Sequence, residues 1–254
     1  MLIDTHCHLD AAEFDADRDE VAARARGAGV GAVVVPGVER AGFAAVLATC
    51  ERYPGCAPAL GIHPMYVAGA RPEDLTVLRE MIVLHHPVAI GEIGLDFFVP
   101  DYDRERQEFY FSEQLKIARE FDLPVLLHIR RAQDAVLKLL RQFRPVGGIA
   151  HAFSGSRQQA EEFIKLGFKL GFGGAMTYDC ATKLRELAAT LPLDSIVLET
   201  DAPDMPPAFI GKARNSPEYL PRIAGILAEL RGMTVAEVAA ATTVNARAIL
   251  KGLA

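Results

Sequence analysis

The chain has 254 residues and a formal net charge of -6 at pH 7, and half of its residues are hydrophobic. No apolar run approaches the roughly 20 residues that a membrane span needs, and no basic segment precedes an apolar one at the N-terminus, so we expect a cytoplasmic protein without a membrane anchor. The negative charge argues against broad attraction to nucleic acid, although a local basic rim or bound cations could still hold a phosphate chain. Since α/β barrels commonly occupy about 250 residues undivided, this length predicts one domain over residues 1–254.

Short apolar runs alternate with longer amphipathic segments along the chain, which is typical of βα units. We expect strands at residues 2–5, 32–36, 57–61, 88–93, 124–129, 148–152, 169–172 and 195–200. The clearest predicted helix covers residues 104–121, and a final helical segment covers residues 235–250. Eight such units without a linker rich in Pro, Gly or Ser favour a closed (β/α)8 TIM barrel, with an open doubly wound sheet as the alternative.

The first ten residues read MLIDTHCHLD and place His6 and His8 directly after an apolar start. Side chains two residues apart on a strand leave the same face, so both imidazoles can reach one ion while Cys7 points away. Imidazole suits Zn, Mn, Fe or Ni, and carboxylates added from elsewhere would admit Mg. The alternative is two surface histidines on a fraying terminus. The pair points to a metal-dependent hydrolase.

In a barrel, catalytic residues lie at the C-terminal ends of the strands, where the loops form the active face. The chain has seven histidines, and only His85 and His86 fall away from the predicted strand ends. The other five are His6, His8, His63, His128 and His151. This concentration at one face predicts that they belong to one site.

Two carboxylates follow buried apolar strands and complete this set. Glu92 closes the run of residues 88–90, and because an unpaired buried charge is costly, it needs cations or hydrogen-bond donors nearby. We therefore consider Glu92 a candidate bridge between two ions. Asp201 could ligate a metal, orient the attacking water as a base, or do both. For either carboxylate alone, a salt bridge or a helix N-cap is the alternative. Together with the histidines they predict two divalent ions, with Mg, Mn and Zn all acceptable.

Basic and aromatic residues near the same strand ends could contact a phosphate chain. Arg130 lies two residues beyond His128, on the same face, and could bind a phosphate bidentately; a salt bridge at the barrel mouth is the alternative. The loop after the eighth strand could add contacts through Lys212, Arg214 and Asn215, although a solvated loop is the favoured interpretation for Lys212. Most barrel aromatics pack in the core or the loops, but some near the strand ends could stack exposed bases, the candidates being Phe97, Phe98, Tyr102, Phe153 and Tyr178.

Seven short motifs together give the chain a resemblance to a known family: DTHCH, GIHP, GEIGLD, LPVLLHIR, HAFSG, ETDAP and RNSPEYL. In order and spacing they resemble the TatD family of metal-dependent hydrolases and deoxyribonucleases, over nearly the whole chain. The resemblance implies a TIM-barrel phosphoesterase of the metal-dependent hydrolase (amidohydrolase-like) type. It implies one metal at His6, His8 and a bridging Glu92, a second at Glu92, His128 and His151, Asp201 near the nucleophilic water, and His63 facing the substrate phosphate.

The stretch DAPDMPP at residues 201–207 departs from members of the family that carry Tyr-Leu after Asp-Ala-Pro. This departure suggests a subgroup with a different substrate.

Three functions are compatible with these residues. The first is a metal-dependent phosphodiester hydrolase, a TatD-like 3′ exonuclease that acts on DNA with a water activated by two metals and has no obligate protein partner. The second is a binuclear hydrolase of an ester, lactone or amide outside nucleic acids. Many such barrels use a modified lysine as the bridging ligand, so Glu92 at that strand end counts against it. The third is a binding or regulatory barrel, which the loss of a ligand would favour, and no ligand is missing.

Overall fold

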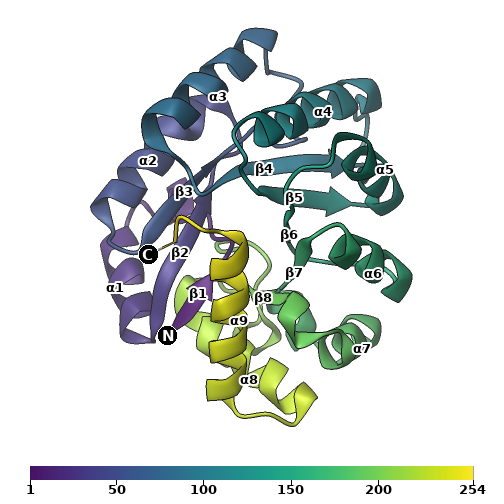
Figure 1. Cartoon of the computed structure of the whole chain (residues 1–254). Coiled ribbons are helices and arrows are strands. Elements are labelled where there is room, and N and C mark those ends of the chain that lie inside the picture. The colour runs from purple at the N-terminus through teal and green to yellow at the C-terminus, as the bar shows by residue number, and fades with distance from the viewer. Residues whose placement is uncertain (254) are drawn as a thin grey trace.

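A computed structural model describes residues 1–253 and shows one sheet of eight parallel strands, each paired with its neighbours in chain order. The strands are β1 (Leu2–Asp4), β2 (Val30–Pro36), β3 (Cys56–Leu60), β4 (Ala89–Asp96), β5 (Val125–Arg130), β6 (Gly148–Ala150), β7 (Phe168–Phe172) and β8 (Ile196–Leu198). Near the open edge, the backbone N–H and the hydroxyl of Thr5 both donate to Leu198 O at 3.1 Å, which links the end of β1 to β8. The predicted TIM barrel is confirmed, as a nearly closed one (Figure 1).

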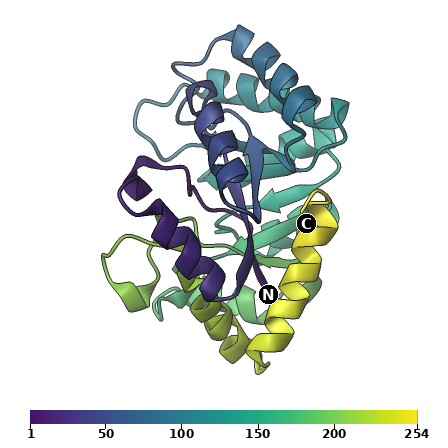
Figure 2. The same ribbon diagram turned by 90° about the vertical axis from the view of Figure 1, so that its left-hand side faces the viewer.

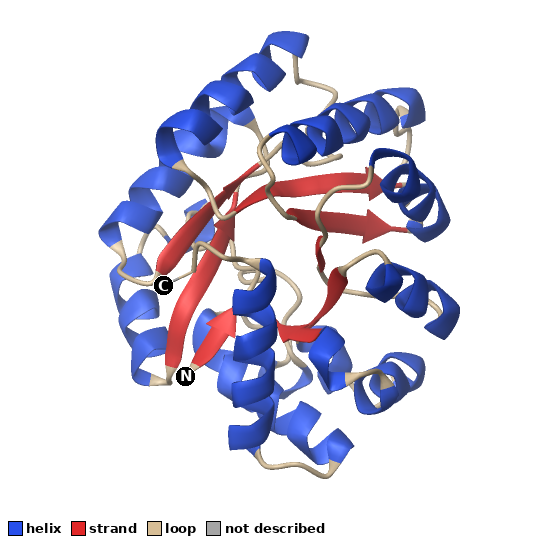
Figure 3. Ribbon diagram, viewed as in Figure 1, coloured by secondary structure: helices blue, strands red, loops and turns tan. Residues whose placement is uncertain are grey.

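The α-helices surround the strands (Figure 3). Their bounds are α1 (Arg18–Gly27), α2 (Phe43–Arg52), α3 (Pro72–His85), α4 (Arg104–Glu120), α5 (Gln133–Phe143), α6 (Arg157–Lys165), α7 (Thr182–Thr190), α8 (Leu220–Arg231) and α9 (Val235–Ile249). The helices predicted at residues 104–121 and 235–250 correspond to α4 and α9 within one residue at each end. Within residues 1–253, no helix is long and apolar enough to cross a membrane.

An apolar cluster fills the lower part of the barrel and leaves the other end to polar side chains. Its members lie on strands around the barrel or, for Val88, directly before one, and are Ile3, Ala32, Val34, Ala59, Val88, Ala89, Leu126, Ile149 and Val197. Ala246 and Leu250 at the end of α9 complete the cluster. In Figure 2, α9 (yellow) lies on the opposite side of the sheet from the loops that follow β1 (purple) and β8 (yellow-green). The N-terminal end of the barrel is therefore closed by packing, and the site lies at the C-terminal end.

The fourth strand contains an irregularity that places a carboxylate inside the barrel. Its register with β5 shifts between Ile90 and Ile93, and both isoleucines belong to the apolar cluster between sheet and helices. In a regular strand, side chains alternate between the two faces, so one residue would separate two that point outward. Here Gly91 and Glu92 lie between them, as expected for a β-bulge, which re-aims side chains next to functional sites. Glu92 consequently faces the centre of the barrel mouth.

Candidate metal centre

Glu92 is the central residue of a cluster of five histidines and one aspartate. Its side chain is 3 % exposed, and its two oxygens face different partners. Oε2 lies 3.1 Å from Nε2 of His6 and 3.6 Å from Nε2 of His8. Oε1 faces the remaining three histidines, at 3.0 Å from His128 Nδ1 and 3.5 Å from the Nε2 atoms of His63 and His151. A carboxylate divided between two groups of imidazoles in this way has the arrangement of a bridging ligand.

His6, His8 and Asp201 form the group on the Oε2 side. The Nε2 atoms of the two histidines are 3.3 Å apart, and Asp201 Oδ1 lies 3.7 Å from His6 Nε2 and 3.8 Å from His8 Nε2. Strand β1 ends at Asp4, earlier than predicted, so neither histidine lies on a strand. The side chains still alternate in direction: Cys7 packs in the apolar cluster between sheet and helices, while His6 and His8 face the site.

On the Oε1 side, His63 and His128 lie close enough to Glu92 to share an ion with it. His151 on this side and His6 on the Oε2 side form another such group with Glu92. The GIHP histidine, His63, is thus a member of the cluster itself. Its ring packs edge-on against that of His128, with 4.2 Å between the ring centroids.

Buried charge determines the protonation of the cluster. Burial lowers the pKa of His6 to about 3, with a further contribution from His151, so its imidazole is neutral, as a metal ligand must be. Burial also lowers the pKa of His8, but the hydrogen bond and charge of Glu92 and the charge of Asp201 outweigh it and raise this pKa to about 9. The pKa of Glu92 is well below its usual range, because the surrounding histidines outweigh the effect of burial.

This donor set fits divalent cations. Within residues 1–253, no lysine or arginine forms an ion pair with Glu92, so its buried charge depends on imidazoles alone. Nδ1 of His6 is buried without a hydrogen-bond partner, and its Nε2 faces two other ligand atoms. Imidazole nitrogens and carboxylate oxygens that converge within 4.8 Å of one another match the ligands that Zn, Mn and Mg accept in mixed sites.

Three further carboxylates support the ligands, and the sequence patterns predict no role for them. Asp96 Oδ2 lies 2.9 Å from Nε2 of His128, on the ring edge opposite to Glu92. Glu199 Oε1 lies 3.3 Å from His151 Nδ1, without hydrogen-bond alignment, and accepts from the N–H of Ala152 at 2.5 Å. Their signal in the sequence is weak, because each is one more acidic residue in a motif, Asp96 in GEIGLD and Glu199 in ETDAP.

The third supporting carboxylate, Asp4, is fully buried and joins the two chain segments that carry His6 and Asp201. It accepts from the N–H of Thr200 at 2.9 Å and from its hydroxyl at 2.6 Å, and from the N–H of His6 at 3.3 Å. Asp201 N–H in turn donates to His6 O at 2.8 Å. These hydrogen bonds fix the position of His6 relative to Asp201.

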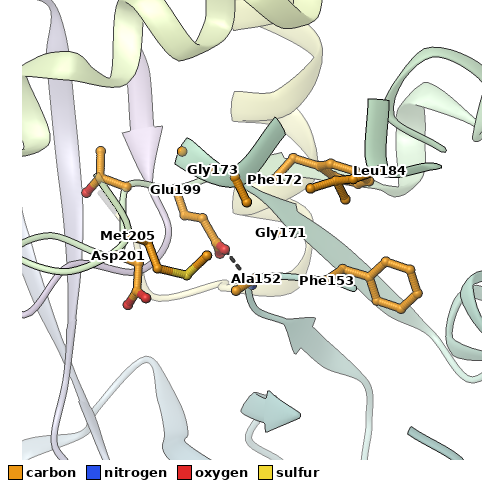
Figure 4. Close-up of a pocket in the computed structure, with 12 residues that line it drawn as sticks. Ala152, Phe153, Gly171, Phe172, Gly173, Leu184, Glu199, Asp201 and Met205 are labelled. Atoms are coloured by element: carbon orange, nitrogen blue, oxygen red, sulfur yellow. Dashed lines mark hydrogen bonds between the residues drawn. The ribbon is translucent and has the colours of Figure 1, made fainter. Parts of the chain in front are cut away.

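Gly171 on β7 and Gly173 just after this strand make room for Glu199. A Cβ at Gly171 would lie 2.2 Å from Glu199 Oε2, and one at Gly173 would lie 2.9 Å from Glu199 O. Figure 4 shows Glu199 reaching toward Ala152, with Asp201 and Met205 beside it. The cavity around these residues has room for about one water molecule, at about 10 Å³. It is too small for a nucleobase.

The residues predicted to contact phosphate near the site divide into two groups. Arg130 is exposed at the mouth, on β5 next to the cluster. Arg214 instead pairs with Asp17 at 2.6 Å, and Asn215 is buried with its side-chain amide bonded to Thr200 O at 2.7 Å. The side chains of these two residues are engaged in contacts that hold the loop after β8 in place.

Comparison with known proteins agrees with this geometry. The family described as TatD related DNase matches residues 3–251. This chain belongs to the TatD family. The metal-dependent hydrolase YjjV of Escherichia coli is 45 % identical over 247 residues, which cover 96 % of this chain and 95 % of YjjV. The crystal structure of YjjV, a TatD homolog, superposes with a TM-score of 0.95 and covers 98 % of each chain. A 3′-5′ ssDNA/RNA exonuclease TatD from Erwinia tasmaniensis is 35 % identical over 97 % of this chain and 98 % of its own length.

The chain is thus a TatD-family metal-dependent hydrolase, and the cluster around Glu92 offers imidazoles and carboxylates suited to holding a metal. The fold is shared more widely: an amidohydrolase from Saccharomyces cerevisiae superposes with a TM-score of 0.84 at 18 % identity.

Proposed function

We propose that this TatD-family protein is a phosphodiesterase that removes nucleotides from the 3′ end of single-stranded DNA and uses two divalent cations, Mg, Mn or Zn. The observation that carries the proposal is the division of Glu92, whose two oxygens face separate groups of imidazoles. The naming of several relatives as 3′-5′ ssDNA/RNA exonucleases supports the choice of substrate.

The proposed division of the ligands is the one that the resemblance to the family implies, and the distances to Glu92 are compatible with it. One ion would take His6, His8, Glu92 and Asp201, and the other would take Glu92, His128 and His151, whose nearest nitrogens lie 3.0 Å and 3.5 Å from Glu92 Oε1. Two bound cations would lower the pKa of a water molecule and offset the negative charge that builds on the phosphoryl group.

The chain's own residues would then orient the reactants. Asp201 lies at the exposed edge of the cluster, with its side chain 14 % exposed, so its carboxylate can accept a proton from the attacking water. His63 would face a phosphoryl oxygen, and Arg130 would bind phosphate at the mouth.

The test begins with protein stripped by a chelator and reloaded separately with Mg, Mn or Zn. The substrate is a single-stranded DNA oligonucleotide labelled at its 5′ end, and we expect a metal-restored ladder that shortens from the 3′ end. The His6→Ala variant should lose this activity, while His85→Ala, which alters an exposed histidine at the end of α3, should keep it. Intact DNA with every metal, together with cleavage of an ester or lactone, would refute the nuclease and keep the metal centre.

A further inference from the structure

Two consecutive arginines beside the metal centre define a second anionic subsite. We infer that Arg130 and Arg131, gathered on the ring of Phe98, bind the phosphate next to the scissile one. This rests on the proposed function and specifies it: the substrate is a chain with at least two phosphates, held at two points.

The arrangement of the two guanidinium groups is unusual for neighbours in sequence. Their Cζ atoms lie 3.7 Å and 4.5 Å from the centroid of the Phe98 ring. In an extended strand, consecutive side chains point to opposite faces, so both would not reach one ring. Here β5 ends at Arg130, and Arg131 adopts a left-handed conformation with φ 54°, which non-glycine residues rarely do. This turn gathers both positive charges on one aromatic ring.

Both guanidinium groups remain free to bind an anion. Within the described part of the chain, the ring contact is the sole side-chain interaction of each. Other arginines near the mouth are committed to protein partners: Arg214 pairs with Asp17, and Arg106 donates to Val67 O. Two unpaired guanidinium groups, both exposed, offer the forked donors that bind phosphate bidentately.

The subsite is connected directly to the metal centre. The N–H of Phe98 donates to Asp96 Oδ1 at 2.9 Å, and the other oxygen of the same carboxylate lies 2.9 Å from His128 Nε2. Strand pairing aligns Asp96 with Arg130, and the N–H of Phe97 donates to Arg130 O at 2.8 Å. Loop and histidine are therefore fixed by one side chain.

The spacing also suits a phosphate chain. His128 and Arg130 are two residues apart on β5, about 7 Å along a strand, and their side chains share a face. That separation is comparable to the distance between successive phosphates of a nucleic-acid chain. A phosphate at the cluster around Glu92 would leave its neighbour within reach of the two arginines.

The test compares substrates that differ in phosphate number: bis(p-nitrophenyl) phosphate and the dinucleotide TpT, each with one phosphate, against the trinucleotide TpTpT and a longer oligonucleotide. With the metal-loaded enzyme, Arg131→Ala should raise KM about tenfold for the substrates with two or more phosphates, and leave both one-phosphate substrates unchanged. Arg144→Ala is the matched control, since Arg144 is also exposed and left-handed, at φ 50°, but follows α5 at the other end of the barrel.

Equilibrium binding gives a readout that does not require turnover. In the Asp201→Asn background, fluorescence anisotropy of a labelled oligonucleotide should show weaker binding for Arg131→Ala, with a salt slope smaller by about 0.7 for one lost phosphate contact. Phe98 acts through the arginines, so Phe98→Leu should weaken binding in the otherwise unchanged protein and have no further effect once Arg130 and Arg131 are both alanine.

Equal effects of Arg131→Ala on one-phosphate and two-phosphate substrates would overturn the inference, and so would unchanged oligonucleotide binding. The proposed function fails separately, if the unsubstituted protein cleaves no phosphodiester with any metal. Binding by the Asp201→Asn protein then still decides whether the arginines hold a phosphate chain.

Discussion

Nε2 of His128 lies 2.9 Å from Oδ2 of Asp96, and the opposite nitrogen of the same ring, Nδ1, lies 3.0 Å from Oε1 of Glu92. A carboxylate that accepts from one ring nitrogen keeps the proton there and leaves the other nitrogen with a lone pair for an ion. Asp96 thus selects the form of His128 that can ligate at Nδ1. Its other oxygen accepts from the N–H groups of Phe98 and Val99, which prevents it from rotating away.

Asp96→Asn should weaken metal binding on the His128 side by about 10- to 100-fold. The amide oxygen would stay with the N–H donors of Phe98 and Val99, so the NH2 group would face His128 Nε2 and shift the ring proton to Nδ1. That nitrogen could then no longer ligate. Isothermal titration of the metal-free protein with Zn measures the affinity.

The control for this substitution is Asp122→Asn. Asp122 lies between α4 and β5, before the start of the strand that carries His128, and has φ 53°, a conformation that asparagine tolerates well. Equal Zn affinity of the Asp96→Asn and the unsubstituted protein would show that Asp96 does not set the tautomer of His128.

Gly171→Ala should lower both stability and metal affinity. The added Cβ would meet Glu199 Oε2 at 2.2 Å and displace the carboxylate that lies beside His151. Overpacking of a buried site costs about 1–3 kcal/mol. Denaturant unfolding and Zn titration measure the two effects.

Gly225→Ala provides the comparison, because Gly225 lies within α8 with nothing within 4 Å of the new Cβ. It should stabilise the protein by about 0.5–1 kcal/mol, the usual gain for alanine in a helix. Similar destabilisation in both variants would mean that the space around Glu199 is not the cause.

Much of the fold could be predicted from the sequence, because each βα unit carries its own local signal. The apolar runs of β2 and β5 lie close to their predicted positions. β4 differs most: it extends to Asp96, three residues beyond the predicted end, because Leu95 and Asp96 pair with Ile129 and Arg130 of β5. Pairing between strands depends on partners distant in sequence, which a local pattern does not contain.

The candidate ligands could also be predicted, since histidines at strand ends are conspicuous in the sequence. The carboxylates that position these ligands could not. Asp4 and Glu199 lie in the same motifs as the ligands, and composition cannot distinguish a carboxylate that faces a metal from one that holds a ligand. The bulge that turns Glu92 inward could not be predicted either, because the sequence from Val88 to Ile93 has the pattern of a regular buried strand. From the sequence, Arg214 was a plausible phosphate contact. Its pairing with Asp17 is visible only in the structure.

Metal affinity should increase with pH between about 6 and 9. Burial lowers the pKa of His151, but the charges of Asp201, Glu199 and Glu92 outweigh it and raise this pKa to about 10, and that of His8 is raised to about 9. Both imidazoles therefore carry a proton at pH 7 in the metal-free protein, and an ion must displace these protons. Lowering the pH strengthens the competition from protons, so the affinity falls.

Titration calorimetry in two buffers of different ionisation enthalpy measures the protons released, and we expect on the order of two per protein at pH 7. His8→Ala should reduce the release by about one proton. His6, with a pKa of about 3, is already neutral at pH 7 and contributes none. An affinity that stays constant from pH 6 to 9 would contradict these protonation states.

Asp201→Asn should reduce turnover by about 10²- to 10⁴-fold, the usual contribution of a positioned general base, while the fold is retained. Asp201 has φ 58°, and asparagine is among the few residues that adopt this conformation readily, so the backbone and its N–H bond to His6 O should survive. Rates on a single-stranded oligonucleotide at saturating metal, with Asp204→Asn in the same loop as the control, measure the loss. If turnover persists, Asp201 is not the base. If metal content falls together with turnover, Asp201 acts chiefly as a ligand, since its Oδ1 lies 3.7 Å and 3.8 Å from the Nε2 atoms of His6 and His8.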